Sequence, residues 1–336
     1  MRAARLHAAR DIRLDEVPLP EPSAGEVLVR VRAVSICASD VRMYWDGHAG
    51  GVVPEAPISQ GHEFSGEIAA LGEGVGGPPV GTRVAVEPSW HCGECDMCRS
   101  AHENLCRNIV FPSFPPRNGA LAEYIACPAD AVCPLPDTVS DIEGALVEPL
   151  GVALHAVRLA RPRPGAEIAV LGAGAIGACV LATLRAYGHE RLALAEPIAG
   201  RRDWAARFTS LPPVASAQDL LASGYEADLV FECAGENSAI EDALGLARPA
   251  GTVVVVGIPH PERISLDANI PRRKELTVIF SRRSRATLEE AVTLVAEGRL
   301  DLAAFPVRRY TLGQTAGAIE ATASRPGDML RAVVLP

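Results

Sequence analysis

The segment at residues 168–184, IAVLGAGAIGACVLATL, constrains the fold of this chain most strongly. Four apolar residues lead directly into a GxGxxG turn, and apolar residues at helical spacing follow it. A glycine turn between a strand and a helix is typical of sites where a dinucleotide pyrophosphate meets a helix N-terminus. We expect the cofactor to lie against Gly172, Gly174, Ala175, Ile176 and Gly177.

Short apolar segments alternate with helix-length segments on both sides of this turn. Strands that are almost wholly apolar and alternate with helices indicate a parallel sheet covered on both faces. The pattern predicts an α/β fold class, with a doubly wound dinucleotide-binding domain over residues 150–285. Its further strands are expected in the segments RLALAEP, ADLVFECAG, GTVVVVGIP and ELTVIFS.

Residues 1–149 have a different pattern, in which short β-like runs such as EVLVRVRAV, RVAVEP and LAEYIA are separated by turns rich in Gly and Pro. We therefore expect a mostly β first domain. A helical pattern begins at Asp141 and ends before Pro162. Residues 286–336 form a third segment with two helical and two strand-like stretches.

Composition excludes several classes of function. The chain has 336 residues, 48% of them hydrophobic, and a net charge of −9, which disfavours a surface that neutralises nucleic-acid phosphates. Its longest uncharged stretch, residues 168–184, is shorter than the roughly 20 residues that cross a bilayer. The first residues lack the apolar run of a secretory signal. We expect a cytoplasmic protein without nucleic-acid or membrane partners.

Four cysteines, Cys92, Cys95, Cys98 and Cys106, lie within fifteen positions. Four thiolates in a short loop fill a tetrahedral Zn²⁺ site and leave no open position for a substrate, so this spacing predicts a structural zinc. A redox dithiol is the alternative that a CxxC pair raises, but it needs a neighbouring βαβ unit. An iron–sulfur cluster would use similar ligands.

The strand RLALAE ends at Glu196, nineteen residues after Gly177. A carboxylate at this distance accepts hydrogen bonds from the adenosine ribose and repels a 2′-phosphate, which favours NAD over NADP. Arg201 and Arg202 follow, and a guanidinium there is the alternative feature that would receive the phosphate of NADP. Cys233 and Gly257, together with Arg201, complete the expected cofactor-binding residues.

A second group of potential metal ligands is spread along the chain. SICASD contains Cys37 and Ser39, GHEFSG contains His62 and Glu63, and ALVEPLG contains Glu148. A mixed Cys, His and Glu set with one open position is typical of catalytic zinc sites. Taken singly, Cys37 and His62 also fit ordinary buried core positions.

The ordered series SICASD, GHExxGxIxxxG, GTRV, the four-cysteine loop, VEPL and GxGxxG resembles the zinc-containing medium-chain alcohol dehydrogenase family over essentially the whole chain. Glu148 and the stretch FPSFPPRNGALAEY are similar to its sorbitol, polyol and threonine dehydrogenase branch. The resemblance implies a GroES-like catalytic domain to which residues 286–336 return, a Rossmann NAD domain, and two zinc ions per chain. Arg42 stands where many relatives have a proton-relay histidine.

The resemblance also implies the roles of individual residues. Catalytic zinc is held by Cys37, His62 and Glu63, with Glu148 as a ligand or a close neighbour, and the hydroxyl of Ser39 takes the alcohol proton. Segments that approach the substrate contain Tyr44, Phe111, Glu123 and Arg282.

Oxidation of a polyol, sugar alcohol or cyclitol by NAD is the activity we expect from this resemblance. A threonine-type amino alcohol is the alternative substrate, because YWDGHAGG is similar to that branch. A zinc-stabilised NAD-binding module without turnover is the alternative from another class. Relatives assemble as homodimers or homotetramers, and VVVVGIPH is a candidate edge strand for such assembly.

Overall fold

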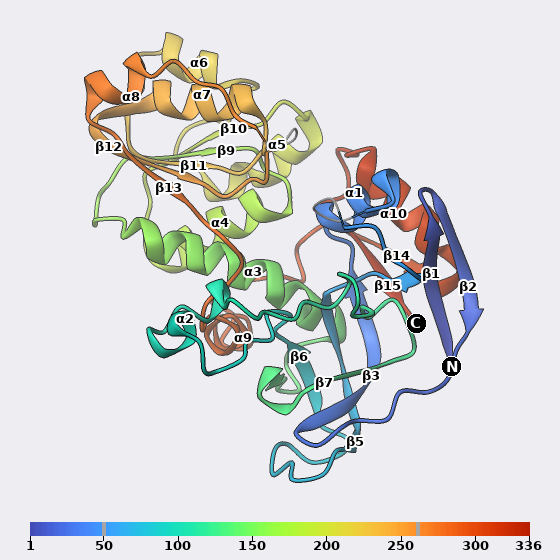
Figure 1. Ribbon diagram of the computed structural model, residues 1–336. Coiled ribbons are helices and arrows are strands. Elements are labelled where there is room, and N and C mark those ends of the chain that lie inside the picture. The colour runs from blue at the N-terminus through green and yellow to red at the C-terminus, as the bar shows by residue number, and fades with distance from the viewer. Residues whose placement is uncertain (49–51, 260–262) are drawn as a thin grey trace. The chain divides into compact units, whose positions relative to one another are not determined.

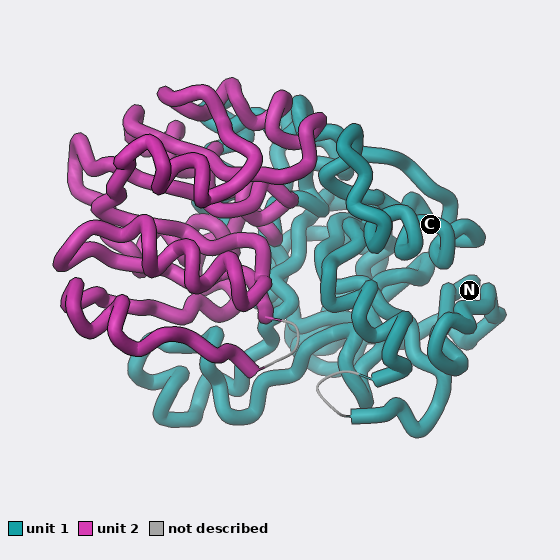
Figure 2. Tube along the Cα trace, turned by 90° about the horizontal axis from the view of Figure 1, so that it is seen from above, with its two compact units in different colours: residues 1–148, 288–336 teal, residues 149–287 magenta. Residues whose placement is uncertain are grey.

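A computed structural model describes residues 1–48, 52–259 and 263–336. The chain divides into two compact units (Figures 1 and 2). Unit 1 contains Met1–Glu148 and Leu288–Pro336, and unit 2 contains Pro149–Thr287. The last part of the chain therefore folds with the first part. The end of YWDGHAGG and the histidine of VVVVGIPH lie outside the described residues.

Unit 2 is built on a five-stranded parallel sheet in the order β10-β9-β11-β12-β13. Its strands are β9 (Ile168–Leu171), β10 (Leu192–Ala195), β11 (Ala227–Glu232), β12 (Ala247–Val255) and β13 (Thr277–Phe280). Its helices are α4 (Ala175–Ala186), α5 (Ala199–Ala205), the 3-10 helix η3 (Ala206–Phe208), α6 (Ala217–Ala222), α7 (Asn237–Leu246) and α8 (Asn269–Lys274). Figure 1 shows α4 and α7 on opposite faces of the sheet. The expected doubly wound α/β fold is confirmed.

Burial marks only one edge of this sheet, because β10 lies at the other edge and is wholly buried. Every residue of β9 and β10 is buried, as expected for strands covered on both faces. The strand β13 lies at one edge and is largely exposed, with Phe280 60% accessible. The proposed edge strand VVVVGIPH is therefore wrong, because Val253, Val254 and Val255 belong to β12, which pairs with β11 on one side and β13 on the other. Its apolar composition reflects burial.

Unit 1 contains a seven-stranded sheet. Six of its strands follow the order β14-β15-β3-β5-β6-β8, and the seventh, β7, pairs with β3. A separate three-stranded sheet has the order β2-β1-β4. The strands are β1 (Arg2–Ala8), β2 (Asp11–Glu16), β3 (Glu26–Ser35), β4 (Ile58–Ser59), β5 (Glu63–Leu71), β6 (Arg83–Val86), β7 (Tyr124–Pro128), β8 (Val132–Pro134), β14 (Val307–Thr311) and β15 (Arg331–Leu335). The helices are α1 (Ala38–Asp46), α2 (Asp96–Arg99), α9 (Leu288–Ala296) and α10 (Thr315–Ala323), with the 3-10 helices η1 (Glu103–Leu105), η2 (Ala129–Ala131) and η4 (Leu312–Gln314).

The central strand of unit 1 is β3, which pairs with β5, β7 and β15. Its valines Val27, Val29 and Val31 pack into the core with Phe64 and Ile68 of β5. β-branched side chains suit this environment because they pack well on a pleated, buried surface. This core supports two loops, one that follows the end of β3 and one that precedes the start of β5.

The helix α3 (Asp141–Ala160) begins in unit 1 and continues into unit 2. It follows the sequence prediction at both ends, and it contains Pro149, which lacks the N–H of a normal intrahelical bond. Among the helices described, none combines the length and the apolar character that a membrane crossing requires.

Candidate active site

The glycine turn of unit 2 connects β9 to α4. Gly172 has a φ of 92°, in the left-handed region that glycine adopts without steric cost. Gly174 is the N-cap of α4, so Ala175, Ile176 and Gly177 form its first turn. The backbone N–H groups of a first helical turn lack intrahelical partners and attract anions. This geometry fits a pyrophosphate.

Close backbone packing explains the third glycine. A Cβ placed on Gly177 would overlap the carbonyl oxygen of Gly172 and lie 3.3 Å from the Cβ of Cys233. Gly257 follows β12, where a Cβ would collide with the backbone of Gly235. These residues gather at the carboxyl ends of β9, β11 and β12, which is where open parallel sheets bind their ligands. The structure thus brings Cys233 and Gly257 to the same edge as the glycine turn.

Glu196 follows β10 and is buried. Its Oε2 accepts a hydrogen bond from the backbone N–H of Ala173 at 2.6 Å, and its Oε1 accepts one from Ile198 at 2.8 Å. The carboxylate therefore holds the glycine turn in place. Arg201 also borders the turn, since its Nη1 lies 3.8 Å from the position of a Cβ on Gly174. Sequence reasoning did not anticipate the contact of Glu196 with the turn itself.

The sulfur atoms of Cys92, Cys95, Cys98 and Cys106 all lie within 4.8 Å of one another in unit 1. The Sγ–Sγ distances are 3.5 Å for Cys95–Cys98, 3.5 Å for Cys92–Cys106 and 3.9 Å for Cys95–Cys106. A tetrahedron with Zn–S bonds of about 2.3 Å has sulfur atoms about 3.8 Å apart. A disulfide requires about 2.05 Å. The donor set therefore fits a closed four-thiolate zinc site.

Backbone donors favour the thiolate form of Cys92 and Cys95, whereas burial raises the pKa of Cys98 to about 12. Hydrogen bonds from the backbone N–H groups of Arg107 and Cys98 lower the pKa of Cys95 to about 6. The side chain of Arg107 also forms a two-bond ion pair with Asp96, at 2.6 and 2.7 Å. That pair joins the start of α2 to the residue that follows Cys106.

A second group of potential ligands comprises Cys37, His62 and Glu63, whose donor atoms also lie within 4.8 Å of one another. Strand pairing explains how residues so far apart in sequence meet. Ser35, the last residue of β3, is the antiparallel partner of Glu63, the first residue of β5. Cys37 lies two residues after Ser35, and His62 immediately precedes Glu63. The turn of β3 into α1 therefore faces the start of β5.

Asp40 fixes both sides of this group. One carboxylate oxygen accepts a hydrogen bond from the backbone N–H of Cys37 at 2.9 Å, which caps α1, and the other accepts one from Gly61 at 3.1 Å. The Nδ1 of His62 lies 3.7 Å from Asp40 and 3.4 Å from the hydroxyl of Ser113. Oriented imidazoles of this kind are common beside metal sites, because the far nitrogen is then presented to the ion.

Arg331 of β15 holds the third member of the group. Its Nη2 lies 2.9 Å from Oε1 of Glu63, and its Nη1 donates to the carbonyl of Ile36 at 2.7 Å. Oε2 of Glu63 is buried and has no hydrogen-bond partner in the described part of the chain. A buried carboxylate oxygen without a donor is costly unless a cation or proton occupies it. The orphaned oxygen is therefore available to a metal ion.

Charges around the group are crowded. Burial raises the pKa of the Cys37 thiol to about 12, and the Glu63 carboxylate adds to the effect. Burial also raises the pKa of Glu148 well above its ordinary value, again with a contribution from Glu63. A cation relieves this repulsion. Glu148 and the group therefore affect each other electrostatically. The Glu148 carboxylate is not one of the donor atoms that lie within 4.8 Å of one another.

The expected substrate residues are placed in different surroundings. Phe111 lies beside the metal-ligand group, with its ring centroid 5.0 Å from that of His62. Tyr44 is buried and donates a hydrogen bond to Glu320 at 3.0 Å. Glu123 is paired with Arg2 at 2.8 Å. Arg282 belongs to unit 2, where it is exposed after β13.

Ser39 lies in the first turn of α1 and is half-buried. A hydrogen bond from its side chain favours the thiolate form of Cys37 and is the weakest of the effects on that thiol. The structure thus brings Ser39 to the same group as Cys37. Arg42 lies one turn further along the same helix.

Sequence reasoning placed Asp40 beside Cys37 and Ser39 without giving it a role, and it missed Arg331. Asp40 stands in the quoted segment SICASD, and its position three residues after Cys37 is a recognisable helix-capping signal. Arg331 carries no local signal, because it meets Glu63 only through the pairing of β15 with β3. Residues that act through long-range strand pairing are not visible in a single sequence.

Two protein families match this chain. Residues 23–137 match the alcohol dehydrogenase GroES-like domain, and residues 167–297 match the zinc-binding dehydrogenase family. Among curated proteins, the sorbitol dehydrogenase of Bacillus subtilis (strain 168) is 33% identical over 100% of this chain and 97% of its own length. The sorbitol dehydrogenase of Bombyx mori is 33% identical over 95% and 94%.

Solved structures agree over the whole chain. A protein from Sinorhizobium meliloti 1021, assigned to the zinc-binding dehydrogenases and bound to NADP, superposes with a TM-score of 0.89 and 29% identity, covering 100% of this chain and 99% of its own. An alcohol dehydrogenase from Escherichia coli CFT073, described as short chain and complexed with NADH, gives a TM-score of 0.91 and 25% identity, with coverage of 100% and 99%.

The fold, the two ligand groups and these matches define the class. The chain belongs to the zinc-binding dehydrogenases with a GroES-like domain, the zinc-dependent medium-chain alcohol dehydrogenase family. It is a dehydrogenase of the alcohol and polyol type.

Proposed function

We propose that this dehydrogenase oxidises a secondary hydroxyl group of a polyol, sugar alcohol or cyclitol and transfers the hydride to NAD. The observation that carries the proposal is the convergence of Cys37, His62 and Glu63 in unit 1. The similarity to sorbitol dehydrogenases over nearly the whole chain supports a polyhydroxylated substrate. When bound, zinc and NAD supply Lewis acidity toward the substrate hydroxyl and a hydride acceptor, respectively.

Cys37, His62 and Glu63 are the residues that we propose hold the catalytic zinc. The Nδ1 of His62 faces Asp40 and Ser113, so Nε2 is the nitrogen assigned to the metal. Glu148 is proposed as a further ligand or a close carboxylate, which its strongly raised pKa supports. Its burial and the nearby Glu63 charge both favour a role next to a cation.

Ser39 is the residue to which we assign the first proton transfer. Its hydroxyl lies beside Cys37 and is half-buried, so its Oγ is able to receive a proton from the substrate hydroxyl and release its own toward solvent. A positioned acid–base group of this kind contributes about 10²–10⁴-fold to a rate. Phe111 provides an apolar wall against His62. Substrate contact by Tyr44, Glu123 and Arg282 stays a prediction, and the bond of Tyr44 to Glu320 and the ion pair of Glu123 with Arg2 do not support it.

The four-cysteine loop is proposed to hold a structural zinc. All of its ligand positions are filled by Cys92, Cys95, Cys98 and Cys106, so no position is open for a substrate. The glycine turn and the residues at the same sheet edge are proposed to bind NAD: Gly172, Gly174, Ala175, Ile176, Gly177, Glu196, Arg201, Cys233 and Gly257.

We further propose a cytoplasmic homodimer or homotetramer. An odd set of nine cysteines fits a reducing compartment better than a disulfide framework. The exposed edge strand β13, with Val278 and Phe280 on its surface, supports assembly through unit 2. Light scattering of purified protein measures the assembly directly, and a monomer at all concentrations would contradict it.

A substrate screen tests the proposed function. Sorbitol, xylitol, a cyclitol and L-threonine are offered with NAD, and the formation of NADH is followed by absorbance. We expect turnover with the polyols or the cyclitol and little with L-threonine. Cys127→Ala should keep the wild-type substrate preference, because Cys127 is buried in the core of unit 1 and is outside both ligand groups. Preferred oxidation of L-threonine would overturn the substrate assignment.

Cofactor choice is tested separately with Glu196→Ala. We expect wild-type kcat/KM to be higher with NAD than with NADP, because the carboxylate opposes a 2′-phosphate while Arg201 lies near the same turn. Removing the carboxylate should narrow that preference by about tenfold or more. An unchanged ratio would contradict the role of Glu196 in cofactor choice.

A further inference from the structure

Glu232 is the last residue of β11 and lies at the same sheet edge as the glycine turn. It is fully buried, at 0% exposure. Its Oε1 accepts hydrogen bonds from the backbone N–H groups of Ala234 and Gly235, both at 2.7 Å. A carboxylate that accepts two backbone donors fixes the conformation of the segment that carries them. Glu232 therefore holds residues 233–235, which we call the β11 turn.

The backbone of Glu232 binds the segment that follows β12. Its carbonyl oxygen accepts hydrogen bonds from the N–H groups of Val256, at 2.8 Å, and Gly257, at 3.0 Å. A Cβ placed on Gly257 would lie 2.3 Å from the backbone nitrogen of Gly235 and 2.9 Å from Oε2 of Glu232. The backbone at Gly257 is thus packed directly on the β11 turn and on the carboxylate that holds it.

The β11 turn also touches the glycine turn. Cys233 donates its backbone N–H to the carbonyl of Leu171 at 2.9 Å. A Cβ placed on Gly172 would lie 3.2 Å from the backbone nitrogen of Ala234. The β11 turn therefore contacts the glycine turn on one side and Gly257 on the other. Because such close packing leaves no free space, a shift of the β11 turn must displace one of these neighbours.

Two buried carboxylates flank the glycine turn, because β9 lies between β10 and β11 in the sheet. On the β10 side, Glu196 accepts the N–H of Ala173 at 2.6 Å. On the β11 side, Glu232 accepts two N–H groups of the β11 turn. Burial raises the pKa of Glu232, and the N–H groups of Gly235 and Ala234 act in the opposite direction. Buried N–H groups need an acceptor oxygen, and a neutral oxygen satisfies them as well as a charged one.

We propose that Glu232 is a positioning residue for NAD, because its Oε1 holds the β11 turn in the conformation that the cofactor meets beside the glycine turn and Gly257. This inference rests on the cofactor site of the proposed function. The role requires an acceptor oxygen at the position of Oε1 and does not require a negative charge. Glu196 differs in this respect, since its charge is proposed to oppose the 2′-phosphate of NADP.

Two conservative variants separate the acceptor from the charge. Glu232→Gln keeps an acceptor oxygen at the same distance from the backbone and loses the charge, whereas Glu232→Asp keeps the charge and draws the oxygen back by one methylene. NADH is titrated by fluorescence into the zinc-loaded full chain without substrate. The Kd of Glu232→Gln should stay within about threefold of wild type, and the Kd of Glu232→Asp should rise about tenfold or more.

Asp228→Ala is the matched control, because Asp228 lies at the opposite end of the same strand. Its Oδ2 accepts the backbone N–H of Glu167 at 2.9 Å, and its Oδ1 pairs with Arg248 at 2.6 Å. Removing these bonds should lower the melting temperature and leave the Kd for NADH at the wild-type value. The control thus separates a general loosening of β11 from a change in the β11 turn.

Two further measurements distinguish positioning from a purely structural role. Hydrogen exchange at the amides of Ala234 and Gly235, measured without cofactor, should be faster in Glu232→Asp and near wild type in Glu232→Gln. In steady-state kinetics, Glu232→Asp should raise the KM for NAD while kcat at saturating NAD stays within about threefold. The preference for NAD over NADP should be unchanged in Glu232→Gln.

Three results would overturn the proposal. One is a wild-type Kd for NADH in Glu232→Asp. Another is a Glu232→Gln protein that binds NADH as weakly as Glu232→Asp, which would show that an acceptor oxygen is not sufficient. The third is an equal loss of affinity in Asp228→Ala. If wild-type protein failed to bind NADH, the cofactor assignment of the proposed function would be wrong, and this inference with it.

Discussion

The guanidinium of Arg331 lies 2.9 Å from the carboxylate of Glu63, and both side chains are buried, at 6% and 1% exposure. The pair joins β15, near the end of the chain, to the first residue of β5. A buried ion pair is weak evidence for net stabilisation, because both groups lose their hydration. Its importance lies in position, since Glu63 belongs to the group that we propose binds zinc.

Arg331→Met should therefore be strongly destabilising in the metal-free protein. It leaves the Glu63 carboxylate buried without its partner, which typically costs about 3–5 kcal/mol. Denaturant unfolding measures the loss. The double variant Arg331→Met, Glu63→Gln should recover part of it, because a neutral amide replaces the unpaired charge. A loss of stability in the double variant equal to the sum of the losses in Arg331→Met and Glu63→Gln would show that the two residues do not interact.

Gly177→Ala tests the close packing of α4 on the glycine turn. The added methyl group collides with the Gly172 carbonyl, so the turn must shift, and we expect a higher KM for NAD and a loss of about 1–3 kcal/mol in stability. Gly245→Ala is the control, because a Cβ there meets only Leu221 at 3.7 Å. It should stabilise α7 by about 0.5–1 kcal/mol. Equal KM values in the two variants would contradict the proposed packing.

Much of unit 2 was predictable because its signals are local. The strand β9, the glycine turn and α4 follow one another within twenty residues, and each step has its own sequence pattern. The edge strand was mistaken because apolar content reports burial, and the run Val253–Val255 is buried between neighbours. Pairing order depends on chain crossovers, which a single sequence does not record.

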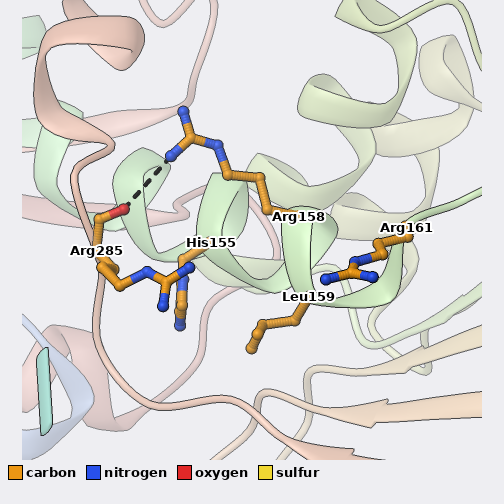
Figure 3. A pocket seen from close by; sticks show the side chains of 5 residues that line it. All are labelled: His155, Arg158, Leu159, Arg161 and Arg285. Carbon is orange, nitrogen blue, oxygen red and sulfur yellow. Dashed lines mark hydrogen bonds between the residues drawn. The ribbon is translucent and has the colours of Figure 1, made fainter. Parts of the chain in front are cut away.

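The pH dependence of stability should show a contribution from His155, which lines a pocket with Arg158 and Arg285 (Figure 3). Burial and the neighbouring arginines lower its pKa to about 4 in the folded protein, against about 6.5 unfolded. Between these values the unfolded chain binds the proton more readily, so stability is present above pH 6.5 and falls as the pH drops toward 4. The loss is at most about 3 kcal/mol. His155→Gln should flatten this part of the profile of stability against pH. An unchanged slope would show that His155 does not contribute to it.

Cys95→Ser tests the structural role of the four-cysteine loop. A serine hydroxyl is a poor replacement for a thiolate ligand, so the loop should lose its zinc and the protein should unfold at a lower temperature or assemble less well. The fraction that stays folded should keep a kcat within a few fold of wild type. Thermal unfolding and single-turnover hydride transfer separate the two effects. A stable variant without hydride transfer would contradict a structural role.

The proposed catalytic residues were only partly accessible from the sequence. Cys37 and His62 lie in separate segments, and the family resemblance alone suggested that they meet. The structure supplies the physical reason, which is the pairing of Ser35 with Glu63 across two strands. Asp40 and Arg331 depend on that same arrangement. The contact of Glu196 with the backbone of Ala173 depends on a side-chain conformation that no spacing rule predicts.

Metal content and polyol-dependent NAD reduction in Cys37→Ala together test whether Cys37 holds the catalytic zinc. Wild-type protein loaded with zinc should contain two ions per chain, and the variant should contain one while retaining the four-cysteine site. Polyol-dependent NAD reduction should fall by several orders of magnitude in the variant and stay near wild type in Cys127→Ala. A Cys37→Ala protein that contains two zinc ions per chain and reduces NAD at the wild-type rate would contradict the account.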